Sequence, residues 1–380
     1  MKKFRITAVI LLLVTVLVCC SKDDVNTSSG FNSLPLTASA PSDNPLTAEK
    51  IALGKMLFWD PVLSGNKDVA CASCHHPSYG YGDGLDLSIG VNGQGLGTQR
   101  HFLSPNSIPF AKRNALSLLN TAFNGIDKNG NYDPSTAAMF FDNRVRSLEL
   151  QSLEPMKTLE EMKGRSIAST DILDTIVNRL KNISQYSVLF ESAFQIKDAV
   201  TAQNLGRAIA SYERTLLANH SPFDEYMRGN KSAMTSAQIQ GMNDFVSSGC
   251  ARCHSGPMFS DYSLHVLSVP DNTKLPTDAG ANGSYAFRTP SLRNLSFTAP
   301  YMHSGVFNSL DAVLDFYERV GDHHSQNGHV SNDQLDENLG RVRGNDKASI
   351  IQFLNALNDP DFDKTIPAAV PSGLHPGGNL

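Results

Sequence analysis

The apolar residues of this chain recur mainly at the spacing of amphipathic helices, and strand signals are weak. Within residues 170–217 they follow one another at intervals of three and four, which predicts helices. The clearest run is formed by Leu205, Ile209, Tyr212 and Leu216. The pattern therefore predicts a mainly α-helical fold.

Three segments of the C-terminal half are also predicted to be helical. Residues 235–249 open on Thr235 or Ser236, either of which can cap a helix, and close on a glycine directly before a pair of cysteines. The ranges 309–320 and 345–359 are the other two. We expect the last of them to pack against the group that these cysteines bind.

The N-terminus carries an export signal. Basic residues precede an apolar run over residues 6–18, which is too short to be a comfortable transmembrane helix. The run ends in LVCC before SKDD and resembles a lipobox, so we expect a lipoprotein signal peptide over 1–20 with Cys20 as the lipidated residue. Export without a lipid is the alternative. Residues 21–45 are rich in Ser, Asn, Thr and Pro and are predicted to form a flexible tether.

Composition and charge exclude some classes of partner. The chain has 380 residues, enough for two domains, and 41% of them are hydrophobic. The formal net charge is −5 and no basic block is present, so no nucleic-acid surface is predicted. The export signal predicts a place on the periplasmic side of a Gram-negative envelope, as an outer-membrane lipoprotein that meets the membrane only through its lipid.

Four cysteines remain beyond the export signal, and they fall into two copies of one motif, CASCH (71–75) and CARCH (250–254). Two disulfides would explain their even number but not the histidine at the same offset in both copies. Zinc could bind CxxC plus His, but two complete copies favour the signature of covalent haem c attachment. We therefore predict two haem c groups, bound by Cys71, Cys74 and His75 and by Cys250, Cys253 and His254, with each histidine as an iron ligand.

Two haem motifs imply two cytochrome c-like helical domains, with long loops over 76–115 and 255–300 that wrap the cofactors. The predicted haem domains span 46–200 and 201–358. A tail over 359–380 follows them.

Seven stretches occur in a fixed order and cover most of residues 46–357. They are LGKMLFWDPVLSGNKDVACASCHHP, DGLDLSIG, RNALSLLNTAFN, FFDNRVRSLELQ, AIASYERTLL, GCARCHSGPMF and FRTPSLRNLSFTAPYMHSGVFNSLDAVLDFY. In this order they resemble the bacterial di-haem cytochrome c peroxidases and their MauG-type relatives. The resemblance implies that the N-terminal haem reduces hydrogen peroxide and that the C-terminal haem passes on electrons. The donor would be a small cytochrome c, a cupredoxin or an organic molecule, and a homodimer is possible.

The resemblance also bears on whether the N-terminal iron has a second ligand, opposite His75. Many of these peroxidases cap it with a histidine in a stretch that resembles SIGH, whereas this sequence reads SIGV, with Val91 in that place. A valine cannot bind iron, so we expect an open site even in the fully ferric protein. The alternative is that His101 moves in as the cap.

The second iron ligand of the C-terminal haem is also set by comparison with the family. Other members carry Met fourteen residues after the histidine of PYxH, and MauG-type proteins carry Tyr; here the count from His303 reaches Tyr317. A phenolate stabilises ferric iron, whereas Met raises the potential. The alternatives are that Tyr317 is a core residue of the helix over 309–320, or that Met302 is the ligand.

The resemblance places the acid–base group of peroxide reduction at Glu149, in RSLELQ. Such a carboxylate must come within hydrogen-bond reach of the bound peroxide. A solvated helix residue is the alternative. The glutamine that accompanies it in the family is replaced by Met139.

Two further expectations come from the family. A calcium ion between the haems would be held by Asn114, Thr298 and Pro300 through neutral oxygen atoms. Many relatives place a Trp between the haems, but the single Trp of this chain, Trp59, precedes the first motif. Tyr132 is the possible substitute.

Four functions remain open from the sequence. The first is peroxide reduction, and the second is a MauG-like oxidase that uses peroxide to oxidise a partner. The third is a di-haem electron carrier without peroxide chemistry. The fourth is a structural zinc protein.

Overall fold

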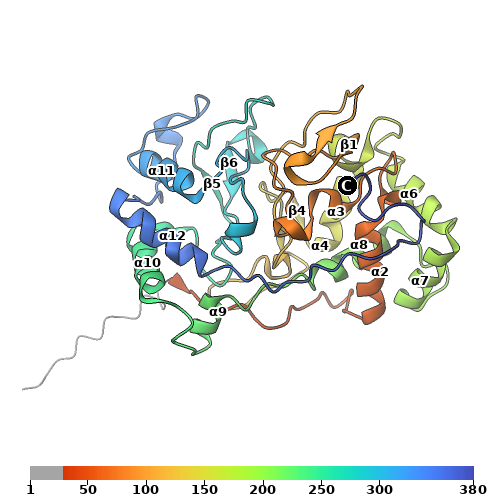
Figure 1. Ribbon diagram of the computed structural model, residues 1–380, viewed down its shortest axis with the longest axis horizontal. Coiled ribbons are helices and arrows are strands. Elements are labelled where there is room, and N and C mark those ends of the chain that lie inside the picture. The colour runs from red at the N-terminus through yellow and green to blue at the C-terminus, as the bar shows by residue number, and fades with distance from the viewer. Residues whose placement is uncertain (1–28) are drawn as a thin grey trace, which may run out of the picture.

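The computed structural model describes residues 29–380, and its short helices and paired strands follow one another as in Figure 1. The α-helices are α2 (Ala48–Trp59), α3 (Cys71–Cys74), α4 (Leu148–Gln151), α5 (Glu154–Lys157), α6 (Ile172–Lys181), α7 (Ser184–Phe194), α8 (Ala202–Glu213), α9 (Pro222–Met227), α10 (Ser236–Ser247), α11 (Leu310–Val320) and α12 (Lys347–Asn355). The strands are β1 (Gly93–Gln94), β2 (His101–Phe102), β3 (Ala138–Met139), β4 (Val145–Arg146), β5 (Leu264–Val266) and β6 (Ala286–Arg288). The predicted mainly α-helical fold is confirmed.

The strands form three antiparallel pairs, β1 with β2, β3 with β4, and β5 with β6. The first and third pairs lie in the two long loops, and the second pair lies between Ala138 and Arg146, where strand signals are also weak. Because each strand is only two or three residues long, its pattern is too short to show alternation.

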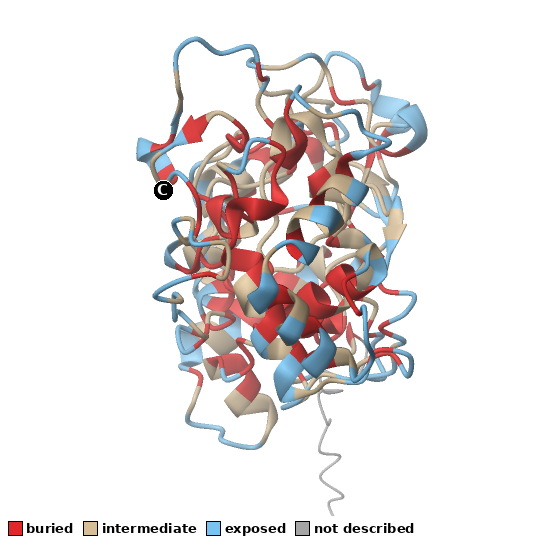
Figure 2. Cartoon of the chain, turned by 90° about the vertical axis from the view of Figure 1, so that its right-hand side faces the viewer, coloured by how far each residue is buried: buried red, intermediate tan, exposed pale blue. Residues whose placement is uncertain are grey.

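The elements gather in two lobes, which Figure 1 shows side by side: α2 to α8 form the N-terminal lobe, and α10 to α12 with β5 and β6 form the C-terminal lobe. In the N-terminal lobe α2 packs along α8, and the two backbones meet at Gly54. A Cβ atom there would lie 2.0 Å from the carbonyl oxygen of Ala208, so only glycine fits. Figure 2 shows the helices of this lobe with their buried faces turned inward. Because α8 belongs to this lobe, the predicted boundary at residue 200 has to move beyond Glu213.

The C-terminal lobe is built around aromatic rings. Phe223, Phe245, Phe259 and Phe353 are buried together, and helix α10 begins at the predicted cap, Thr235, whose side chain accepts a hydrogen bond from the Gln238 backbone.

The N-terminal segment from residue 29 crosses the molecule along the lower side of Figure 1, from the C-terminal lobe to α2. Phe31 packs within the aromatic core, with its ring centroid 4.8 Å from that of Phe259. Asn44 is fully buried. The prediction of a flexible tether over 21–45 is therefore wrong for residues 29–45, because apolar and amide side chains that look isolated in the sequence are anchored by distant elements. The signal peptide and Cys20 lie outside the described residues.

The C-terminal segment, predicted as a tail, crosses back to the N-terminal lobe and ends beside α3 (Figure 1). The Ser73 hydroxyl donates a hydrogen bond of 2.7 Å to the Gly377 carbonyl, and Gly378 pairs with Val69. Residues 359–380 thus help to hold the first cysteine motif. Among the described residues, no helix is both long and apolar enough to cross a membrane.

Candidate functional site

The first cysteine motif forms a single helical turn, α3, followed by His75. The His75 Nδ1 atom lies 3.0 Å from the carbonyl oxygen of Tyr81, which fixes the ring and leaves Nε2 available as a ligand. Tyr81 has a φ of 59°, a conformation that turns its carbonyl back toward the ring. Burial lowers the pKa of His75, so the ring is held neutral, as a metal ligand must be.

The second motif repeats this geometry. The His254 Nδ1 atom lies 2.9 Å from the carbonyl oxygen of Phe259, whose φ is 53°. Burial lowers the pKa of His254 as well. Cys71, Cys74, Cys250 and Cys253 are free thiols, as covalent haem attachment requires, and none forms a disulfide.

A cavity of about 530 Å³ opens beside the first motif, and Cys71, Cys74 and His75 line it. His75 is the only histidine among the described residues of its lining. Val91 is buried behind the cavity in the apolar core, and its backbone N–H donates to the Glu160 carbonyl over 3.3 Å. His101 is exposed on β2, with Nδ1 3.0 Å from the Gln99 carbonyl oxygen.

Glu149 lies on α4, but it does not line this cavity. Its carboxylate accepts hydrogen bonds from both terminal nitrogens of Arg214, at 2.6 and 2.9 Å, and from Nδ2 of Asn44 at 2.9 Å. Burial alone would raise the pKa of Glu149, but the hydrogen bonds and charge of Arg214, together with Asn44, lower it. Its neighbours Leu148 and Gln151 do line the cavity, so α4 borders the site.

Four acids line the cavity, Asp142, Glu160, Glu161 and Glu213, and sequence reasoning missed the two whose pKa is raised, Glu161 and Glu213. Glu161 lies on a π-helical turn (Leu159–Lys163), and Glu213 is the last residue of α8. Burial raises the pKa of Glu161 to about 7 and that of Glu213 to about 8. In the sequence, Glu213 is only a polar residue at the end of a helical run, so no local signal marked it.

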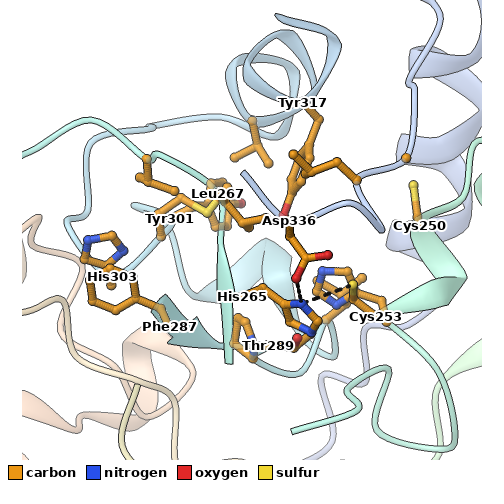
Figure 3. A pocket seen from close by; sticks show the side chains of 18 of the residues that line it. Cys250, Cys253, His265, Leu267, Phe287, Thr289, Tyr301, His303, Tyr317 and Asp336 are labelled. Atoms are coloured by element: carbon orange, nitrogen blue, oxygen red, sulfur yellow. Dashed lines mark hydrogen bonds and ion pairs between the residues drawn. The ribbon is translucent and has the colours of Figure 1, made fainter. Parts of the chain in front are cut away.

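The second cavity encloses about 180 Å³ beside Cys250, Cys253 and His254 and is lined largely by apolar side chains (Figure 3). Tyr317 reaches into it from α11, and burial raises the pKa of its hydroxyl. Met302, the alternative ligand, lines the same cavity. Ile350 and Leu354 do so too, which confirms that the last predicted helix packs at this site.

His265 was also missed. It lines this cavity beside Asp336 (Figure 3), and a second carboxylate, that of Asp261, lies on the other side of its ring. Its Nε2 atom is 3.0 Å from Oδ2 of Asp261, and its Nδ1 atom is 2.6 Å from Oδ2 of Asp336. Hydrogen bonds to Asp261, to the Cys253 thiol and to Asp336 raise the pKa of His265 to about 11, although burial opposes them. The ring is therefore an imidazolium at neutral pH.

The two cavities share a wall. Both are lined by Phe141, Arg288, Pro290, Ser291, Leu295, Tyr301 and Met302. Neither Trp59 nor Tyr132 lines either cavity: Trp59 packs on His76, and Tyr132 packs on Phe123. Tyr301 is the tyrosine among the residues that line both cavities, and its hydroxyl donates to the Leu295 carbonyl over 3.0 Å.

The three residues expected to hold calcium all line the first cavity. They come from distant parts of the chain, yet Asn114, Thr298 and Pro300 are brought together there. The Asn114 amide donates to the Leu85 carbonyl over 2.8 Å, which leaves its oxygen free to act as a ligand.

The donor sets fit haem c, because each cavity presents a thiol pair and one neutral histidine whose Nδ1 is already engaged. The family model of the di-haem cytochrome c peroxidases matches residues 48–232. The chain is 35% identical to the methylamine utilization protein MauG of Methylorubrum extorquens, over 76% of this chain and 74% of the relative. It is 34% identical to the cytochrome-c peroxidase IdrP1 of a Pseudomonas species, over 84% of this chain and 83% of the relative. The chain belongs to the di-haem cytochrome c peroxidase family.

Solved structures agree with this assignment. A MauG-like protein associated with microbial copper homeostasis superposes with a TM-score of 0.68 and 25% identity, over 86% of this chain and 94% of that one. The di-haem peroxidase BthA of Burkholderia thailandensis shares the fold, with a TM-score of 0.65 and 20% identity, over 91% of this chain and 98% of that one. The protein is thus an oxidoreductase that uses peroxide and carries haem c, and the disulfide and zinc readings of its cysteines are excluded.

Proposed function

We propose that this protein reduces hydrogen peroxide at the N-terminal haem with electrons that enter through the C-terminal haem. The observation that carries the proposal is the unequal lining of the two cavities. The first has one histidine and several acids, whereas the second offers a second iron ligand, Tyr317. Haem, when bound, supplies the iron at which the oxygen–oxygen bond is broken.

The residues of this chain hold and protonate the substrate. His75 is the ligand of the reactive iron, and His254 and Tyr317 are the ligands of the other. Glu149 is the acid–base group that the family resemblance implies. Its position beside the cavity supports this role, and its pairing with Arg214 keeps it ionised, ready to accept a proton.

One experiment tests whether the first site is open. One equivalent of hydrogen peroxide is added to the purified, fully ferric protein while the haem spectrum is recorded. We expect an immediate spectral change, because His75 is the one histidine of residues 29–380 that lines the cavity. A change that appears only after one electron has been supplied would show that another residue, such as His101, caps the iron.

A MauG-like oxidase is the second candidate, favoured by Tyr317 and by the likeness to MauG proteins. It would use the same site to oxidise a partner. A search for a co-purifying or genetically linked protein that is oxidised when peroxide is added distinguishes it from a peroxidase with a soluble donor. A simple electron carrier would instead show two six-coordinate haems that are inert to peroxide.

Further details of the proposal rest on the sequence. The donor is a small cytochrome c, a cupredoxin or another small reductant, and the protein acts in the periplasm, anchored by lipid on Cys20. Calcium is held by Asn114, Thr298 and Pro300, and a homodimer is possible. Mass spectrometry of the N-terminal peptide, metal analysis and light scattering test these points in turn.

A further inference from the structure

Beside the first cavity, the Arg214 guanidinium group lies near two carboxyl groups, one partly buried and one almost fully buried. The Arg214 side chain is fully buried, Glu149 is 15% exposed at its side chain, and Glu213 is 3% exposed. Both terminal nitrogens of Arg214 bind Glu149. Glu149 keeps some contact with solvent and also lies in the field of the Lys50 ammonium group, whereas Glu213 is almost fully buried, so burial disfavours the charged form of Glu213.

The hydrogen bonds decide which carboxyl group is neutral. Glu149 accepts from Arg214 twice and from Asn44 once, and all three bonds favour its charged form. The buried Oε2 atom of Glu213 has no hydrogen-bond partner within residues 29–380. The proton therefore resides on Glu213. Glu149 is thus ionised and Glu213 is protonated. A pair of this kind can act as base and acid respectively.

The place of Glu213 connects this proton to the substrate. Glu213 ends α8 at the wall of the first cavity, close enough to Cys71 for its charge to act on the thiol. The charged groups that act on Glu213 itself are Arg214 and Glu149. The same cavity is also lined by other charged groups of both signs: Asp142, Glu160, Glu161, Lys112, Arg113, Arg144, Arg288 and Arg293.

We propose that Glu213 is the acid that delivers a proton to peroxide in the first cavity, while Glu149 remains the anion that accepts one. The proposal rests on the proposed function. Reduction of hydrogen peroxide to two waters breaks the oxygen–oxygen bond and consumes two electrons, from the donor, and two protons. One proton passes from the Glu213 carboxyl to the departing oxygen, which leaves as water. The proton that Glu149 accepted and one proton from solvent go to the second oxygen, which takes up the two electrons and leaves as the second water. Arg214 stabilises the Glu213 carboxylate that remains, and solvent restores its proton.

The test compares three glutamate-to-glutamine variants of the haem-loaded protein. Glu213→Gln removes the proposed acid, Glu161→Gln removes the competing acid, and Glu191→Gln removes a carboxyl group from the exposed face of α7. Haem content, measured after denaturation, shows that each variant is assembled. Infrared spectra in light and heavy water then report the carbonyl band of a buried protonated acid, and stopped flow gives the peroxide rate against pH.

In the wild type we expect the carbonyl band at neutral pH and a peroxide rate that falls as pH rises through about 8, because the donor loses its proton there. Glu213→Gln should lose the band, lower the rate roughly 100-fold and remove the step in the pH profile. Glu191→Gln should match the wild type.

Three outcomes overturn the proposal. A carbonyl band that persists in Glu213→Gln and vanishes in Glu161→Gln places the proton on the other acid. An unchanged rate and pH profile in Glu213→Gln shows that its proton is not used, although the proposed function stands. A wild type that consumes no peroxide defeats the proposed function as well, and the infrared band still reports where the proton lies.

Discussion

The two haem sites begin from the same local structure and differ in the walls that they do not share. In both, a histidine follows the second cysteine and is fixed by the carbonyl of a residue with positive φ. The first cavity is then the larger and is lined by Glu161 and Glu213, whereas the second is lined largely by apolar side chains and contains Tyr317. The motif therefore attaches haem in the same way at both sites. The residues that line each cavity decide whether the site reacts with peroxide or transfers electrons.

The largest loss of activity is expected when an acid beside the first cavity is replaced. Glu149→Gln should lower peroxide turnover by about 100-fold or more, because the amide cannot accept the proton that the carboxylate takes. Both haems should remain attached. Steady-state peroxide consumption measures the loss, with Glu154→Gln, from a surface ion pair with Lys157, as the control. Unchanged turnover would refute the role of Glu149.

A second change makes the other site resemble that of a Met-ligated relative. Tyr317→Met should raise the reduction potential of the C-terminal haem by a sizeable part of the roughly 0.8 V range that axial ligands span. The potential of the N-terminal haem should stay nearly constant. A spectroelectrochemical titration measures both, and an equal potential in wild type and Tyr317→Met would show that Tyr317 is a core residue rather than a ligand.

The imidazolium of the second site predicts a pH effect on stability. The pKa of His265 is raised from 6.5 to about 11, so its contribution is fully present below pH 6.5 and is lost as pH rises toward 11. When haem is attached, Cys253 is no longer a free thiol and no longer raises the pKa of His265. The stability contribution of His265 is then lost at a lower pH. Thermal unfolding at several pH values should show the wild type losing more stability than His265→Gln between neutral and alkaline pH. Parallel curves would argue against a charged ring.

The smallest functional effect is expected at Val91. The side chain lies in the apolar core and not in the cavity, so Val91→Ala should destabilise the fold by about 1–3 kcal/mol through lost packing. The ferric spectrum and the peroxide reaction should not change. A denaturant titration measures the change in stability, and stopped flow measures the reaction with peroxide. An altered ferric spectrum would mean that position 91 faces the iron.

The sequence predicted what is encoded locally. The CxxCH motifs identify the cysteines and histidines of the haem sites. The helical periodicity of Leu205 and Ile209 predicts the core helix α8. It could not show that Glu149 turns to Arg214 or that Glu213 faces the cavity, because both depend on packing between α4 and α8. The anchoring of Phe31 was hidden for the same reason: its partners lie about two hundred residues or more further along the chain.

The crossing of the C-terminal segment has a consequence for the order in which the protein is assembled. A chain emerges from its N-terminus, so the first cysteine motif is made long before Gly377 and Gly378, which close over Ser73 and Val69. Until those residues arrive, the edge of α3 stays uncovered. The contacts that Gly377 and Gly378 make with the first motif can therefore form only after the residues between them and α3 have been made.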